Sequence, residues 1–171
     1  MNHHPEILAR RHAVSRLSLR VFPDAVLREQ CAPVERFDST LRDLLAEMLV
    51  LMRTRKGIGL AAPQAGLRQR LFVAEIEDRP LCVVNPTIQL LPGEATLCEG
   101  CLSLPGVEVE VSRPDSIVAT GYDERGQKQQ WPATGLWARV IQHETDHLNG
   151  VLIIDHGPPL ANTDSTTGNI L

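Results

Sequence analysis

The sequence predicts one α+β domain, because an amphipathic helical segment, several short strand-like segments and a second helical segment follow one another along 171 residues. Hydrophobic residues make up 43% of the chain, but no apolar run is long enough to cross a bilayer. The net charge of −4 gives no reason to expect a nucleic-acid partner. The first 16 residues lack the continuous apolar core of a secretory signal, so a cytoplasmic location is expected.

The first helix is predicted to run from Asp38 or Ser39, either of which can cap it, to about Arg55. Its apolar residues recur at steps of three and four, as in an amphipathic helix: Leu41, Leu44, Leu45, Met48, Leu49 and Met52. Residues 22–38 precede it and contain two prolines, which indicates a loop with a possible helical turn.

Four strand-like stretches follow, rich in β-branched and apolar residues: 71–76, 81–91, 107–111 and a hairpin within 116–131. A turn at 78–80 is expected to join the first two, and residues 123–126 form the hairpin turn. Residues 107–111, VEVEV, alternate strictly, so one face of that strand should be buried.

The second helix is predicted at 135–148, capped by Thr134 and ended by Asn149 and Gly150. His143 and His147 lie four residues apart, so both imidazoles can point at one metal ion.

Glu144 follows the first histidine, where a carboxylate can take a proton from metal-bound water. Leu136 and Val140 extend the histidine stripe toward the start of the helix, which favours a buried pair. Two solvated surface histidines are the alternative interpretation of this spacing.

A third metal ligand has to come from elsewhere, and residues 98–106, CEGCLSLPG, offer two thiols. A catalytic metal needs three protein ligands and one open position. Cys101 is favoured because small Gly100 lets the backbone approach the ion, whereas Cys98 is expected to be a free thiol. Spacing alone does not choose between them.

Residues 57–64, GIGLAAPQ, lack the Lys-Ser/Thr ending of a phosphate loop. The glycines can let backbone approach a substrate, and the Gln64 amide can donate to a developing oxyanion. An ordinary loop is an equally good interpretation of this stretch when it is taken alone.

Three motifs in order, GIGLAAPQ (57–64), EGCLS (99–103) and QHETDH (142–147), resemble the peptide deformylases over roughly residues 19–155. The resemblance implies antiparallel and mixed β-sheets around a central metal-binding helix. It also implies a metal-dependent hydrolase that removes the N-formyl group from the N-terminal formyl-methionine of newly made polypeptides and releases formate.

The resemblance assigns roles to individual residues. It implies three metal ligands, namely Cys101, His143 and His147. It implies Glu144 as the acid–base, with Gln64 and the Leu102 N–H as oxyanion donors. The substrate would be held by the Gly59 backbone and by a methionine pocket walled by Ile58, Leu136, Val140 and His143.

The resemblance further implies one divalent metal ion, with Fe²⁺ expected natively and Zn²⁺, Ni²⁺ or Co²⁺ as alternatives. Expected partners are formyl-Met nascent peptides and the ribosome near its exit tunnel, without sequence-specific nucleic-acid or membrane binding. The expected location is the bacterial cytoplasm, with an organelle as the alternative. Residues 17–157 are predicted to form the catalytic domain, between a mobile arm at 1–16 and a flexible polar tail at 158–171.

One stretch departs from the family pattern. Many members carry an arginine, often with a nearby glycine, after CLSLPG, where this chain has Glu108 and Val109, so peptide contacts beyond the methionine are expected to differ. Arg113 does match a family arginine, and we expect it to pair with Asp146 and steady the metal helix.

Two other functions compete with deformylation. His-Glu-x-x-His is also the signature of zinc endopeptidases, whose third ligand lies downstream and would here be Asp155 or His156. A non-catalytic domain with a structural metal would instead recruit Cys98 as a fourth ligand and leave Glu144 idle.

Overall fold

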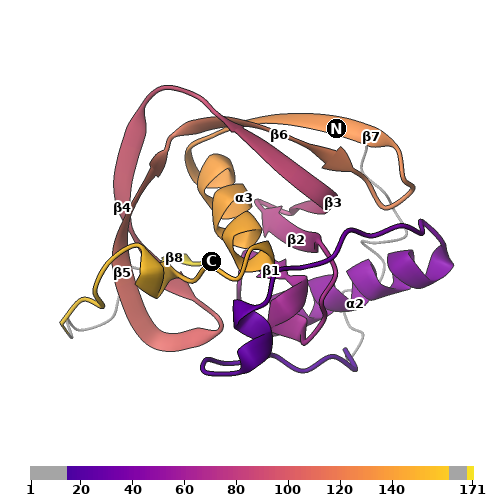
Figure 1. Ribbon diagram of the computed structural model, residues 1–171, viewed down its shortest axis with the longest axis horizontal. Coiled ribbons are helices and arrows are strands. Elements are labelled where there is room, and N and C mark those ends of the chain that lie inside the picture. Colours follow the sequence, from indigo (N-terminus) through magenta and orange to yellow (C-terminus); the bar gives the residue numbers. More distant parts are fainter. Residues whose placement is uncertain (1–14, 162–168) are drawn as a thin grey trace.

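A computed structural model of the protein describes residues 15–161 and 169–171 (Figure 1). The predicted arm at 1–16 lies almost entirely outside the described residues, and so do residues 162–168 of the predicted tail. The mobility of both segments therefore stays a prediction.

The first predicted helix is confirmed as α2, Ser39–Thr54, and the Asp38 carboxylate caps it by accepting a hydrogen bond from the Leu41 N–H at 3.1 Å. The predicted helical turn before it is the 3₁₀ segment η1, Ala25–Arg28. The apolar stripe of α2 is buried in one cluster with residues of the neighbouring strands, so the periodicity of the sequence reports the packing correctly.

Five strands form an antiparallel sheet in the order β1-β2-β3-β6-β7. Their bounds are Gly59–Ala61, Leu71–Ile76, Arg79–Leu90, Ser116–Tyr122 and Lys128–Thr134. The 3₁₀ segment η2, Ala62–Ala65, follows β1. The strand predicted at 71–76 is thus confirmed with the same bounds, and the strand at 81–91 and the hairpin within 116–131 are confirmed with shifted ends.

The turn predicted at 78–80 is wrong. Arg79 already pairs with Ile76 and Pro80 with Glu75, so both belong to β3. The turn consists of Glu77 and Asp78, whose φ angles of 52° and 59° suit the tight two-residue connection of a twisted hairpin.

A second sheet has the order β5-β4-β8, with bounds Leu104–Pro114, Glu94–Cys101 and Asn169–Ile170. β4 pairs antiparallel with β5 and parallel with β8, so this sheet is mixed. The predicted strand at 107–111 lies inside β5, and Val109 and Val111 are buried as its alternation requires. β4 and β8 are absent from the sequence-based prediction.

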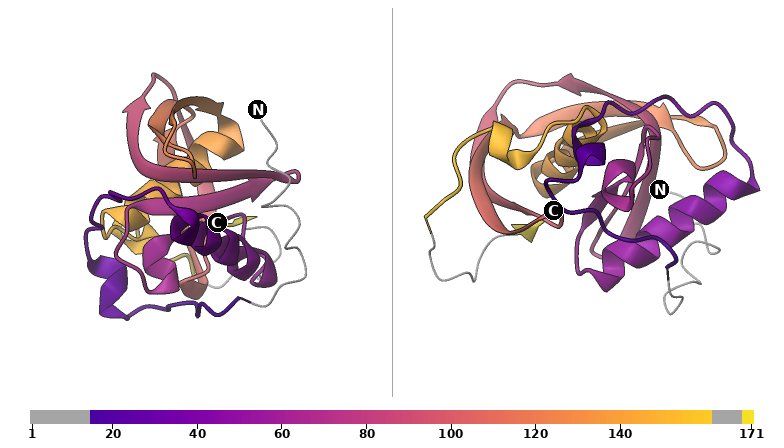
Figure 2. Two further views of the ribbon diagram at one scale, coloured as in Figure 1. Left: turned by 90° about the vertical axis from the view of Figure 1, so that its right-hand side faces the viewer. Right: turned by 60° about the horizontal axis from the view of Figure 1, so that its bottom comes forward.

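The second predicted helix is α3, Gly135–Leu148, and it lies in the middle of the molecule with strands on several sides (Figures 1 and 2). Thr134 occupies the cap position, but its side chain makes no capping hydrogen bond. The 3₁₀ segment η3, Ile153–Asp155, follows. None of the helices among the described residues is long and apolar enough to cross a membrane.

The alternation along β2 explains why the large sheet has a helix on each face. Leu71 and Val73 are buried in the cluster that contains the α2 stripe. Phe72 and Ala74 point to the opposite face and are buried with residues of α3. The sheet thus holds α3 in place on its inner side.

Candidate metal centre

Cys101, at the end of β4, meets His143 and His147 of α3. One ligand atom from each residue lies within 4.8 Å of the other two, and all three residues are buried. The Cys101 Sγ is 3.3 Å from the His147 Nε2, and the two imidazole centroids are 4.9 Å apart. The structure therefore brings together the three residues that the resemblance identifies as metal ligands.

The donor set fits a divalent ion. The His143 Nδ1 lies 3.1 Å from the Glu99 carboxylate, whereas its Nε2 is buried without a hydrogen-bond partner. A buried nitrogen without a partner is costly, and a bound metal ion would satisfy it. One thiolate and two imidazoles make three ligands, which is the number typical of catalytic sites that keep a position open.

The competing ligand sets are not supported. Among the described residues, neither Cys98 nor a residue after α3 joins the ligand group. Asp155 instead pairs with Arg28, and the His156 Nε2 lies 2.8 Å from the Asp146 carboxylate. The described part of the chain therefore provides neither the downstream ligand of an endopeptidase nor the fourth ligand of a structural zinc site.

Burial keeps the metal-free site neutral. Burial raises the pKa of the Cys101 thiol to about 12 and lowers the pKa of both His143 and His147. The imidazoles are thus already in the neutral form that binds metal. Only the thiol has to release a proton when a metal ion binds.

Glu99 organises the charges behind the metal centre. It is fully buried and accepts two hydrogen bonds from Arg113, at 2.7 and 3.0 Å, and one from Arg139 at 2.5 Å. Burial alone would raise the pKa of Glu99, but the hydrogen bonds from His143 and Arg113 outweigh it and hold the pKa far below its ordinary value. The ionised carboxylate fixes the His143 ring so that Nε2 faces the site.

Arg113 also donates to Asp146 of α3 at 2.8 Å, which confirms the predicted pair. The sequence-based interpretation misses the two further members, Glu99 and Arg139. A charged residue inside the EGCLS motif, directly before Gly100, is the signal that could have identified Glu99. Arg139 carries no comparable signal, because its partners are 28 to 44 residues away in the chain.

Glu144 is fully buried, and neither of its carboxylate oxygens has a hydrogen-bond partner. Burial and the nearby Glu99 charge raise its pKa well above the ordinary value. The side chain packs directly against β1, where a Cβ on Gly59 would lie 2.1 Å from the Glu144 Oε1. Such a carboxyl group suits proton transfer near neutral pH.

Gln64 is held with its amide nitrogen toward the centre. Its side-chain carbonyl accepts a hydrogen bond from the Ala61 N–H at 2.8 Å, and its Nε2 lies 3.6 Å from the Cys101 Sγ. The Leu102 N–H belongs to the residue after that cysteine. Two predicted oxyanion donors therefore flank one metal ligand.

The predicted pocket residues also come together. Val140 is fully buried in the cluster on the α3 side of the large sheet, and Ile58 and Leu136 pack against that cluster. His143 lies one helical turn beyond Val140 and is 2% exposed. The sequence-predicted apolar stripe thus leads up to the metal centre.

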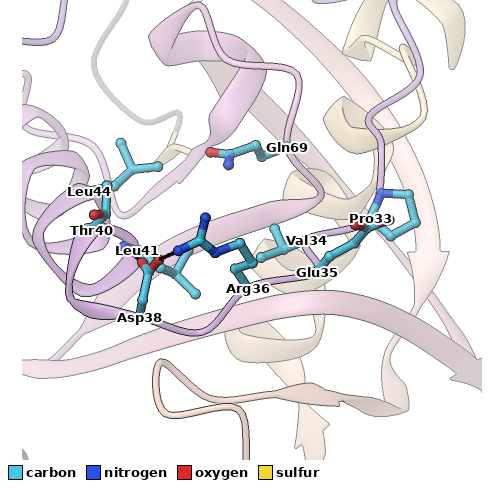
Figure 3. A pocket seen from close by; sticks show the side chains of 9 residues that line it. All are labelled: Pro33, Val34, Glu35, Arg36, Asp38, Thr40, Leu41, Leu44 and Gln69. Atoms are coloured by element: carbon cyan, nitrogen blue, oxygen red, sulfur yellow. Dashed lines mark hydrogen bonds and ion pairs between the residues drawn. The ribbon is translucent and has the colours of Figure 1, made fainter.

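A separate hollow of about 430 Å³ lies at the start of α2, where Arg36 forms an ion pair with Asp38 and the lining includes Leu44 and Gln69 (Figure 3). It contains no residue of the metal centre. The lining contains no histidine or cysteine, and the Arg36–Asp38 ion pair is exposed to solvent, so this hollow does not resemble the buried ligand group of the metal centre.

Comparisons with known proteins agree with this geometry. Residues 17–163 match the family model described as polypeptide deformylase. A peptide deformylase from Dictyoglomus turgidum is 41% identical over 139 residues, which cover 81% of this chain and 91% of that protein.

Solved structures are similar as well. A peptide deformylase from Synechococcus elongatus in complex with actinonin has 44% identity and a TM-score of 0.81, covering 84% of this chain and 80% of that one. The enzyme from Thermotoga maritima has 42% identity and a TM-score of 0.81, covering 85% and 98%. With the family model matching most of its length, this chain belongs to the polypeptide deformylase family.

Proposed function

We propose that the protein is a metal-dependent hydrolase that removes the N-formyl group from the N-terminal formyl-methionine of newly made polypeptides. The observation that carries the proposal is the convergence of Cys101, His143 and His147 beside the unpartnered Glu144 carboxylate. The reaction consumes water, forms a C–O bond, breaks the formyl C–N bond, and yields formate and a free amine.

The ion would be held by Cys101, His143 and His147. It would act as a Lewis acid and lower the pKa of water at the site. Glu144 receives a proton from the attacking water at its carboxylate and then gives it to the departing amine nitrogen. In the metal-free protein, burial raises the pKa of this carboxyl group above its ordinary value, which makes the carboxylate a stronger base.

The tetrahedral oxyanion accepts hydrogen bonds from the Gln64 amide and the Leu102 N–H. The Ala61 N–H holds the Gln64 amide in position beforehand, so little reorganisation is needed during the reaction. Ile58, Leu136, Val140 and His143 form the wall of the pocket that takes the methionine side chain, and the Gly59 backbone holds the peptide.

The proposed native ion is Fe²⁺, as the family resemblance implies, although the ligand set also accepts Zn²⁺, Ni²⁺ and Co²⁺. The proposed site of action is the bacterial cytoplasm, where formyl-Met chains emerge from the ribosomal exit tunnel. Residues 17–157 are proposed as the catalytic domain.

Formate release from formyl-Met-Ala by anaerobically purified, iron-loaded protein tests the function. We expect wild type and Cys98→Ser to release formate, because Cys98 lies outside the ligand group. Cys101→Ser and Glu144→Ala should fold but release none. A folded, metal-loaded wild type without activity, or full activity in Glu144→Ala, would refute the proposal.

A further inference from the structure

Residues 169–171 fill the edge of β4 beside the metal centre. β8 pairs parallel with β4, with Asn169 opposite Glu99 and Ile170 opposite Gly100. The Leu171 N–H then donates to the Gly100 carbonyl at 3.2 Å, and the Leu171 carbonyl accepts from the Leu102 N–H at 3.4 Å. Figure 1 shows β8 between β4 and α3. The segment therefore uses the same Leu102 N–H that would stabilise the oxyanion.

The Leu171 side chain is fully buried in the cluster that contains Val140 and against which Ile58 and Leu136 pack. These are three residues of the proposed methionine pocket. An unbranched methionine and a leucine offer similar apolar volume to such a pocket. The Leu171 side chain thus lies among the proposed pocket residues, while the Leu171 carbonyl occupies the Leu102 N–H, the proposed oxyanion donor.

The direction of the segment separates it from a substrate. Because β8 runs parallel to β4, it runs toward Cys101 and reaches the centre with the Leu171 carbonyl. A formyl-Met peptide starts at the centre with its formyl group and runs away from it. Leu171 therefore brings no formamide to the Leu102 N–H, and the bound segment cannot be deformylated.

We propose that residues 169–171 are a built-in competitor that occupies the Leu102 N–H and the proposed methionine-binding residues until a formyl-Met peptide displaces it; this inference rests on the proposed function. Competition within one chain divides the KM by the fraction of molecules whose site is open and leaves kcat unchanged, because saturating substrate displaces the segment. Occupancy of nine molecules in ten corresponds to a KM about tenfold higher than that of the open site.

The test compares the full chain with a variant lacking residues 169–171 and with Leu171→Asp, which places a charge in the apolar pocket. Leu160→Asp is the matched control, because Leu160 is 40% exposed and lies outside the pocket cluster. KM and kcat for formyl-Met-Ala are measured at several enzyme concentrations. We expect the deletion and Leu171→Asp to lower KM several-fold with kcat unchanged, and Leu160→Asp to change neither.

Amide hydrogen exchange gives a readout independent of turnover. The Leu102 N–H should exchange slowly in the full chain and faster in the deletion variant. If the deletion variant is active and neither its KM nor the exchange rate of the Leu102 N–H changes, the proposed competitor is refuted. A KM of the full chain that rises with enzyme concentration would also refute it, because the segment would then come from a second copy of the protein. A full chain and a deletion variant that both lack activity would refute the proposed function instead, and the exchange data would still decide whether the segment binds.

Discussion

Gly59 of β1 and Glu144 of α3 are packed so closely that a Cβ at position 59 would lie 2.1 Å from the Glu144 Oε1 and 2.8 Å from its Cδ. No side chain fits between the strand and the carboxylate. The glycine thus fixes how near the proposed acid–base can come to the strand that holds the peptide.

Gly59→Ala should therefore displace the Glu144 carboxylate and lower kcat. A misplacement of about 1 Å can cost about a hundredfold in rate, so a loss of that order is expected. Gly157→Ala is the control, because a Cβ there meets its nearest neighbour at an ordinary 3.4 Å. Steady-state kinetics decide the matter, and equal kcat values in both variants would show that the close contact is unimportant.

Arg113→Ala should weaken metal retention. The guanidinium joins the fully buried Glu99, which orients His143, to Asp146 on the metal helix. Loss of a group that orients a metal ligand commonly costs about 10- to 100-fold in metal affinity. The measurement is the metal content at equilibrium against a chelator of graded concentration.

Arg53→Ala is the matched control for this experiment, because Arg53 also makes a two-bond ion pair, with Glu75, away from the metal centre. It should lower the thermal stability while leaving metal affinity unchanged at temperatures where the protein is folded. If Arg113→Ala retained metal as well as Arg53→Ala does, the positioning role of Arg113 would be wrong.

The stability of the metal-free protein should depend on Glu144 and pH. Because burial raises the folded-state pKa of Glu144 above the ordinary 4.5, folding favours its protonated form. Well below pH 4.5 the Glu144 carboxyl group is protonated in both the folded and the unfolded state, so it does not change the free energy of unfolding. As the pH rises above 4.5, the unfolded state ionises first, and stability falls by up to about 1.4 kcal/mol per pH unit until the folded pKa is reached.

Glu144→Gln removes this ionisation, so the variant should gain free energy of unfolding relative to wild type as the pH rises from 5 toward 7. Urea denaturation at several pH values, with a chelator present, measures the difference. If the difference in free energy of unfolding between the two proteins were the same at every pH in this range, the pKa of the Glu144 carboxyl group would not be raised.

The helices and the metal ligands are predictable from the sequence for local reasons. The stripe from Leu41 to Met52 and the spacing of His143 and His147 both follow the helical repeat, which needs no knowledge of the rest of the chain. The choice of Cys101 over Cys98 rests on the neighbouring Gly100 and on the family resemblance, and the structure supplies the missing proximity to the two histidines.

The remaining features depend on contacts between distant residues. β4 contains a glycine and few β-branched residues, so its pattern does not indicate a strand, although it carries both Glu99 and Cys101. Glu99 is buried as an ion only because Arg113 and Arg139 reach it from other elements. β8 follows a polar stretch, and its pairing with β4 leaves no local signature.

Deformylation by this protein requires that one sulfur and two imidazole nitrogens hold the ion and leave a position open. X-ray absorption of the zinc-loaded protein measures this ligand set directly. We predict one sulfur at about 2.3 Å, two nitrogens at about 2.0–2.1 Å and one solvent oxygen. Two sulfur ligands, or a shell of four side chains without solvent, would contradict the account.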